Sequence, residues 1–264
     1  MKPIQPIPDA YASPCEQAGR LEELPVPGFS PAVVYLPCGY DESKDSYPAF
    51  YLLHSGGENP RFFWKDLASS VFKNELDHMI ANGDIVPMIL VTPTYYPLGH
   101  SGDGVAYTAE AVRDFGPVMR ERVVPLVDGT YRTMDDRRFR GIGGFAMGAV
   151  VTWYAMMAGM DLFRWFMPIS GDCWICGERG GGRHAMQTAG LLANAVQGHS
   201  FHLHVLTGNQ DIAFPNLDPQ MKAMKDYRDV FTAKNTHYSV LQGGTHDDAC
   251  IRRYLYNALQ NFFR

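Results

Sequence analysis

The chain has 264 residues and a formal net charge of −5, and this length is sufficient for one α/β domain with a full hydrophobic core. It contains no run or stripe of lysine and arginine, so its charge gives no reason to expect a nucleic-acid partner. Gly, Pro or charged residues interrupt every long apolar run, which predicts no membrane span, and no signal-peptide pattern opens the sequence.

Segments with strand-like and helix-like patterns alternate along most of the chain. This alternation predicts a mostly parallel, twisted sheet with helices on both faces, in a single domain over residues 1–264. Residues 1–30 are expected to form an N-terminal extension that packs on the core or precedes it. The predicted elements are strands at 33–37 and 49–55, a helix at 62–81, a strand at 88–94, a helix at 109–127 that Pro117 should kink or divide, a strand ending at 145, a helix at 149–157, a strand at 165–170, a helix at 183–196, a strand ending near 207, a helix at 219–231, a strand at 238–241 and a helix at 247–262.

The most informative motif lies between the strand that ends at 145 and the helix that follows it. Gly144, Ala146 and Gly148 occupy the three defined positions of the G-x-S-x-G nucleophile elbow, in which a serine sits on a tight turn between a strand and a helix. Small flanking residues permit the close backbone approach that this turn requires. The motif therefore predicts a nucleophile position at 146, where alanine replaces the expected serine.

An acid and a histidine follow the elbow in the chain order typical of an α/β-hydrolase. Asp211 stands in the turn after the apolar strand that ends near 207, and His246 stands after the strand at 238–241. The carboxyl ends of parallel strands meet at one edge of a sheet, which is where such sheets bind their ligands. We expect Asp211 and His246 to meet position 146 at that edge.

A glycine turn is predicted at the same edge, after the strand at 49–55. Gly56 and Gly57 can present backbone amides there, and the amide of Met147, directly after the nucleophile position, can join them. The sequence thus predicts an oxyanion hole made by Met147 with Gly56 or Gly57. An ordinary flexible turn is the structural alternative.

Several separated motifs resemble the feruloyl esterases of carbohydrate esterase family one, and the resemblance extends from about residue 33 to the C-terminus. It implies an α/β-hydrolase fold, Asp211 as the acid, His246 as the base, and no metal or organic cofactor. It also implies feruloylated arabinoxylan or oligosaccharides as substrate, ferulic acid as product, attached xylanase or other modules, and an extracellular location. The motifs that carry it are His54-Ser55-Gly56-Gly57-Glu58-Asn59, Val91-Thr92-Pro93-Thr94, Gly143-Gly144-Phe145-Ala146-Met147-Gly148, Trp153-Tyr154, Phe166-Met167-Pro168-Ile169-Ser170-Gly171-Asp172 and Gly244-Thr245-His246.

Ala146 departs from the pattern of this family, which has serine at that position. A natural pseudoenzyme could have lost its nucleophile, or a deliberate Ser-to-Ala change could have been made to trap an ester; the intact remainder of the motif set favours the deliberate change. An acetyl-xylan esterase and an S-formylglutathione hydrolase are alternative esterases with the same triad. A non-catalytic carbohydrate-binding protein is the alternative outside enzymes.

An aromatic acyl group needs a flat apolar slot, and Trp174 is the first candidate for its wall because its loop follows the strand next to the elbow. Ile212 and Phe214, which follow the acid, are weaker candidates. Asp172 could accept a hydrogen bond from a phenolic hydroxyl or could cap a loop. These four residues, together with Met147 beside the nucleophile position, complete the predicted substrate site.

Cysteines and histidines give little indication of redox or metal chemistry. The five cysteines include Cys173 and Cys176 at a two-residue spacing, yet no second pair offers zinc ligation. His202 and His204 share one side of a predicted strand without an evident third ligand. They are expected to be packed or surface histidines, and no metal is predicted.

Overall fold

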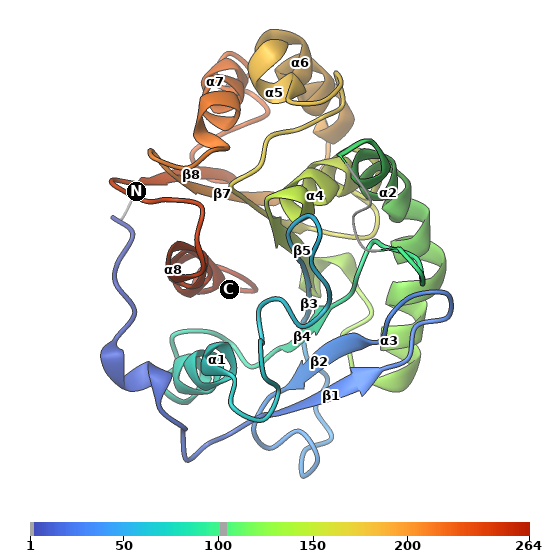
Figure 1. Ribbon diagram of the computed structural model, residues 1–264, viewed down its shortest axis with the longest axis vertical. Coiled ribbons are helices and arrows are strands. Elements are labelled where there is room, and N and C mark those ends of the chain that lie inside the picture. The colour runs from blue at the N-terminus through green and yellow to red at the C-terminus, as the bar shows by residue number, and fades with distance from the viewer. Residues whose placement is uncertain (1–2, 101–104) are drawn as a thin grey trace.

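A computed structural model describes residues 3–100 and 105–264 of the chain, and it contains an eight-stranded sheet (Figure 1). The strand order is β1-β2-β4-β3-β5-β6-β7-β8, in which β2 runs antiparallel to β1 and β4 while all remaining neighbours are parallel. The predicted α/β-hydrolase architecture is therefore confirmed. The strands are β1 (Arg20–Leu24), β2 (Ala32–Leu36), β3 (Ala49–Leu53), β4 (Ile89–Thr92), β5 (Arg140–Phe145), β6 (Trp165–Ile169), β7 (His202–Gly208) and β8 (Thr236–Leu241).

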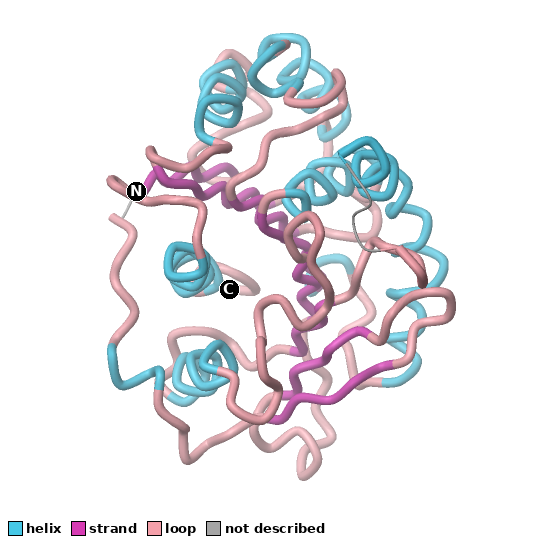
Figure 2. Tube along the Cα trace, in the orientation of Figure 1, coloured by secondary structure: helices cyan, strands magenta, loops and turns pink. Residues whose placement is uncertain are grey.

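Helices cover both faces of the sheet, as Figures 1 and 2 show. One face carries α1 (Val71–Ala81) and α8 (Asp248–Leu259). The other face carries α2 (Val105–Val118), α3 (Val124–Thr130), α4 (Met147–Ala158), α5 (Gly180–Arg183), α6 (Ala185–Val196) and α7 (Phe214–Met224). Short 3₁₀ turns occur at Asp9–Ala12 and Arg137–Phe139, and a π-helical turn occurs at Met119–Val123.

The central strands are buried on both faces, because apolar residues occupy both of their sides. Along β3, Phe50 and Leu52 belong to the core under α1 and α8, whereas Tyr51 and Leu53 belong to the core under α4. All five residues of β3 are buried. This two-sided burial is typical of a parallel sheet covered by helices, and it separates the interior into two apolar clusters.

The helix predicted at 62–81 was wrong over its first nine residues. Residues 62–70 form turns and bends, in which Lys65 has a positive φ of 58°, and α1 begins only at Val71. Ser70 caps the helix, because its side chain accepts a hydrogen bond from the Lys73 amide at 3.3 Å. The aromatic residues of this segment follow a helix-like spacing but pack as a folded loop.

The helices predicted around prolines also differ from the structure. The helical segment at 109–127 is divided by the π-helical turn Met119–Val123 two residues after Pro117, which agrees with the expected disturbance. The helix predicted at 219–231 instead occupies Phe214–Met224. Pro215 stands in its first turn, where a missing amide proton costs nothing, and the helix tolerates Pro219 in its interior.

The N-terminal extension contributes a strand that the sequence pattern did not indicate. Its alternation is weak because β1 lies at the edge of the sheet and is mostly only half buried. Farther upstream, the Arg253 guanidinium donates to the Ile4 carbonyl at 2.7 Å, and the Asn257 amide donates to the Gln5 carbonyl at 2.9 Å. Over the residues that the structure describes, no helix has the length and apolarity needed to cross a membrane.

Candidate active site

Ala146 occupies the turn between β5 and α4 with backbone angles φ 53° and ψ −109°. Positive φ is uncommon for a residue with a Cβ atom, and strained residues of this kind cluster at functional sites. The turn is possible because Gly148 passes against the end of β3, where a Cβ atom would overlap the Leu53 carbonyl oxygen. The strand, the tight turn and the helix predicted from the motif are therefore all present.

Asp211 and His246 meet at the carboxyl edge of β7 and β8. His246 Nδ1 lies 2.8 Å from Asp211 Oδ1, which also accepts the Ala213 amide at 2.8 Å. The Asp211 side chain is fully buried, while the His246 side chain is 20% exposed. A carboxylate bound at Nδ1 fixes the tautomer of the ring and leaves Nε2 to exchange a proton with a substrate.

The turn after β3 approaches the start of α4 closely. A Cβ atom at Gly56 would stand 2.9 Å from Met147 Cγ, and neither the Gly56 nor the Met147 amide donates a loop hydrogen bond among the described residues. The Gly57 amide instead donates to the Tyr96 hydroxyl at 3.0 Å. In this arrangement, the Gly56 and Met147 amides are the pair available for an oxyanion.

His54, directly before this turn, is a buried, neutral ring that connects the turn to the loop after β4. Its Nδ1 lies 2.7 Å from the Ser55 carbonyl, its Nε2 lies 2.8 Å from Thr94 Oγ1, and the side chain is fully buried. Burial lowers the pKa of His54 to about 4, although the hydrogen bond to Ser55 acts in the opposite direction. The ring therefore stays uncharged at neutral pH and holds the geometry of the turn.

The loop after β6 passes directly against the elbow. A Cβ atom at Gly171 would overlap the Ala146 carbonyl oxygen, and the buried Trp153 indole donates to the Gly171 carbonyl at 2.8 Å. Three residues later, Trp174 is half buried, and its carbonyl accepts a hydrogen bond from the Tyr154 hydroxyl at 3.1 Å. Two residues of α4 thus hold the backbone of the loop that carries Trp174.

The Asp172 carboxylate forms hydrogen bonds with its own loop and with α5. One carboxylate oxygen accepts the Trp174 indole N–H at 3.3 Å, and the other accepts the Gly181 amide at 2.9 Å. Burial raises the pKa of Asp172 above its ordinary value, against the lowering effect of these hydrogen bonds. The side chain therefore orients Trp174 and joins the loop to α5.

The two candidates that follow the acid differ in exposure. Ile212 is 76% exposed, and Phe214, the first residue of α7, is half buried. Both lie on the Asp211 side of the candidate site. Their contribution to a substrate site remains a prediction.

Sequence reasoning missed the supporting residues of the site. His54 and Tyr154 belong to the motifs that carry the family resemblance, but the sequence pattern assigned them no role. Tyr96 was not identified from the sequence. A polar residue directly after a buried strand was the available signal for His54. No local signal could indicate that the Tyr96 hydroxyl meets the Gly57 amide, since that contact joins two loops 39 residues apart.

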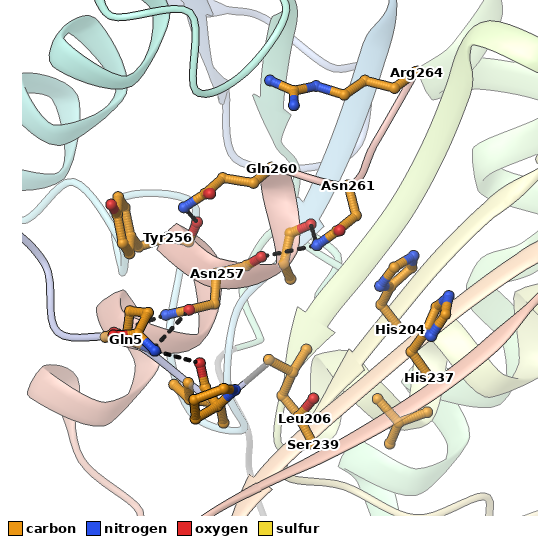
Figure 3. Close-up of a pocket in the computed structure, with 14 residues that line it drawn as sticks. Gln5, His204, Leu206, His237, Ser239, Tyr256, Asn257, Gln260, Asn261 and Arg264 are labelled. Atoms are coloured by element: carbon orange, nitrogen blue, oxygen red, sulfur yellow. Dashed lines mark hydrogen bonds between the residues drawn. The ribbon is translucent and has the colours of Figure 1, made fainter. Parts of the chain in front are cut away.

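A cavity of about 380 Å³ lies apart from this site, between the N-terminal segment, α8 and the β7–β8 edge (Figure 3). His204 and His237 point into it from adjacent strands, with ring centroids 4.7 Å apart. His204 also packs on Phe262, and His202 stacks on Trp165, as expected for packed histidines. Within residues 3–100 and 105–264, no three His, Cys, Asp or Glu side chains are grouped to hold a metal ion.

The five cysteines form no disulfide among the described residues. All five are free, and Cys173 is buried. Burial raises the pKa of the Cys173 thiol to about 12, which disfavours the reactive thiolate. The Cys173 and Cys176 spacing therefore has a structural explanation in the loop that carries Trp174.

The strand order, the strained turn at 146 and the Asp211–His246 contact define the class of this protein as an α/β-hydrolase of the esterase type. No protein-family profile matches the chain. The feruloyl esterase module from Clostridium thermocellum, solved as a serine-to-alanine mutant in complex with sinapinate, superposes with a TM-score of 0.85 at 34% identity, over 100% of this chain and 94% of the module. The chain belongs to the feruloyl esterases of carbohydrate esterase family one.

Two further relatives show the breadth of this similarity. Endo-1,4-β-xylanase Y of Acetivibrio thermocellus is 36% identical over 282 residues, which cover 98% of this chain and 24% of the xylanase. The chain thus spans about a quarter of the length of that relative. The CE1 ferulic acid esterase of Anaeromyces mucronatus shares the fold, with a TM-score of 0.73 at 18% identity over 97% of this chain and 96% of the esterase.

Replacing Ala146 with glycine should stabilise the protein by about 1 kcal/mol, because glycine adopts a positive φ without the penalty of a Cβ atom. The free energy of unfolding in urea measures this effect. Ala195→Gly, in the last turn of α6, is the control and should destabilise the protein by up to about 1 kcal/mol. A loss of stability at 146 similar to that at 195 would show that the turn is unstrained.

The free energy of unfolding should fall as the pH decreases from about 6.5 to about 4. The folded-state pKa of His54, about 4, lies below that of an unfolded histidine, about 6.5, so the unfolded chain binds the proton first in this interval. The expected contribution of one such histidine is about 1.4 kcal/mol per pH unit. The contribution is complete above pH 6.5, and urea unfolding at several pH values measures it.

His54→Gln should reduce the slope of the unfolding free energy against pH in this interval by up to about 1.4 kcal/mol per pH unit, which corresponds to one proton. His199→Gln, at an exposed position, provides the control and should leave the slope unchanged. Equal slopes in the parent protein and the His54 variant would contradict a buried neutral ring at position 54.

Proposed function

We propose that this chain is a feruloyl esterase domain whose parent form carries serine at position 146 and hydrolyses feruloyl esters of arabinoxylan or its oligosaccharides. The observation that carries the proposal is the 2.8 Å contact between His246 and Asp211 at the edge where the strained elbow holds position 146. The likeness to a feruloyl esterase module over the whole chain supports the choice of acyl group.

Two-step acyl transfer follows from this arrangement. The hydroxyl oxygen of a serine at 146 attacks the ester carbonyl while His246 Nε2 accepts its proton, and Asp211 stabilises the resulting imidazolium. The Met147 and Gly56 amides hold the oxyanion. The carbon–oxygen bond to the alcohol then breaks, and the alcohol leaves with the proton from His246.

Hydrolysis of the acyl-enzyme reverses these roles. A water molecule gives a proton to His246 and attacks the acyl carbon, and the serine oxygen takes the proton back as the acid is released. Every proton in this cycle is carried by His246. No metal or organic cofactor takes part.

We propose that Ala146 is an introduced substitution that disables an otherwise complete site. In support, Asp211 and His246 keep their hydrogen bond, and position 146 keeps the strained angles of a nucleophile although alanine gains nothing from them. The protein with Ala146 should therefore bind esters without cleaving them at an appreciable rate.

The acyl group of the substrate is proposed to lie against Trp174, with Met147 beside the reacting carbon. Trp174 presents an aromatic face, and Met147 presents a flexible thioether, which together suit a flat aromatic acid. The Asp172 carboxylate fixes the indole through its hydrogen bond. Ile212 and Phe214 are proposed as more distant contacts on the Asp211 side.

A xylanase module is the proposed covalent partner in the full-length protein. The support is that a xylanase of about four times this length contains a region similar to nearly the whole chain. Such a module would bring the esterase to feruloylated xylan by a local increase in concentration.

Ala146→Ser should raise kcat/KM for methyl ferulate at least about 10³-fold, since it restores the nucleophile to a site that already holds its base. In that background, His246→Ala and Asp211→Asn should each lower kcat by about 10³-fold or more. Lys234→Ala, at an exposed position, is the control and should have no effect. Background rates for the folded Ala146→Ser protein would reject the esterase assignment.

The Ala146 protein should bind ferulate, and Trp174→Ala should weaken that binding about tenfold, because the apolar contact with the indole does not depend on the missing hydroxyl. Trp174→Phe should retain most of the affinity. Calorimetric titration measures both effects. Equal affinities for the alanine variant and the parent protein would place the acyl group elsewhere.

A further inference from the structure

A second pocket is lined by residues of the loop before α1 and of the start of α8. These two helices lie on the same face of the sheet (Figure 1). The pocket has a volume of about 330 Å³, within the range of about 300–1,000 Å³ for small-molecule sites. Its lining includes Phe62, Phe63, Lys65, Ser69, Asp248 and Arg252. One wall thus continues from the oxyanion turn, and the other begins two residues after His246.

Aromatic rings connect this pocket to the proposed base. The His246 ring packs on Phe145, with centroids 4.3 Å apart, and Phe145 stacks on Phe62 at 6.2 Å with an interplanar angle of 13°. Phe62 also lies in the pocket wall. The pocket is therefore separated from His246 by two layers of rings.

The two apolar clusters lie on opposite faces of the sheet, and both are contacted by residues next to position 146. Met147 and Trp174, the proposed acyl contacts, pack against the cluster under α4. Ala146, Phe145 and Phe62 belong to the cluster under α1 and α8. The proposed acyl contacts and the pocket therefore lie on different sides of position 146.

Chemistry determines which half faces the pocket. In acyl transfer, the departing alcohol oxygen takes a proton from the base, so the alcohol half of the ester must lie on the His246 side. Nδ1 is bound to Asp211, which leaves Nε2 for this transfer. The pocket lies on this side of the site, since Asp248, which lines it, follows His246 by two residues.

We propose that this pocket binds a neutral sugar residue of the oligosaccharide that forms the alcohol half of the ester. This inference rests on the proposed esterase function and assigns a second substrate contact to the same site.

The rim of the pocket fits an uncharged polyol. Lys65 and Asp248 form an ion pair at 3.0 Å, and both side chains are more than half exposed. Arg252 binds Glu75, and Ser69 Oγ donates to Asp66 Oδ2 at 3.1 Å. Lys65 and Arg252 balance Asp66 and Asp248 in charge, so the rim offers donors and acceptors without favouring an ion of either sign.

The floor of the pocket supplies the apolar part of sugar recognition. Phe62 and Phe63 pack edge to face with centroids 4.9 Å apart, and Lys65 Nζ lies 4.6 Å from the Phe62 ring centroid. Aliphatic C–H faces of a sugar can rest on such ring edges while its hydroxyl groups reach the rim. The positive φ of Lys65 shows that the loop is held in a strained conformation at this place.

The test compares two substrates in the Ala146→Ser enzyme. Methyl ferulate has a one-carbon alcohol that cannot reach the pocket, whereas a feruloylated arabino-xylo-oligosaccharide can. The double variant Lys65→Ala/Asp248→Ala should lower the ratio of kcat/KM for the oligosaccharide to kcat/KM for methyl ferulate about tenfold. Ser69→Trp, which fills the pocket without removing a charge, should lower the same ratio.

Lys222→Ala is the matched control, since Lys222 pairs with Asp218 on α7, away from the pocket. It should leave the ratio unchanged. An unchanged ratio in both pocket variants, with the proteins folded, would overturn the sugar site while leaving the esterase function intact. Failure of the Ala146→Ser enzyme to hydrolyse methyl ferulate would instead contradict the esterase function, and the sugar site with it.

Discussion

The candidate site depends on a close contact between the start of α4 and the end of β3. Gly148 lies against the Leu53 and His54 carbonyl oxygens with no room for a side chain. This contact sets the distance between the Met147 amide, at the N-terminus of α4, and the turn that carries Gly56. The helix dipole adds a partial positive charge at the same place, so one backbone contact creates the elbow and positions the proposed oxyanion donors.

The supporting residues keep the site rigid without adding charge. His54 is buried as a neutral ring that ties Ser55 to Thr94, and Tyr96 holds the Gly57 amide. Asp172, which could have served as a substrate acceptor, has both carboxylate oxygens hydrogen-bonded, one to the Trp174 indole and one to the Gly181 amide. Trp174 thereby gains a fixed orientation, which reduces the side-chain entropy that the protein loses when an aromatic ligand binds.

The sheet itself organises the proposed chemistry. Because β3 and β5 are buried on both faces, successive residues of the elbow turn toward different apolar clusters. Phe145 faces the side of α8, and Met147 faces the side of α4. In the proposed binding mode, the acyl and alcohol halves of the substrate meet different surfaces, so each half can be recognised separately.

Local sequence determined much of this protein. The G-x-A-x-G motif fixed the strand, turn and helix around Ala146, because glycine is needed where backbones meet, and the alternation of apolar segments indicated a parallel sheet. The positions of Asp211 and His246 after successive strands indicated their shared edge. These inferences depend on neighbouring residues, so they can be drawn from a single sequence.

Only the tertiary structure decided the remaining features, because they depend on contacts between distant segments. Strand β1 is stabilised by pairing with β2, and the loop at 62–70 is shaped by aromatic packing rather than by its helix-like spacing. The hydrogen bonds of Gly57 to Tyr96 and of Asp172 to Gly181 likewise join separate loops. Local pattern specifies which element a residue belongs to, whereas packing across the chain specifies which groups remain free to act.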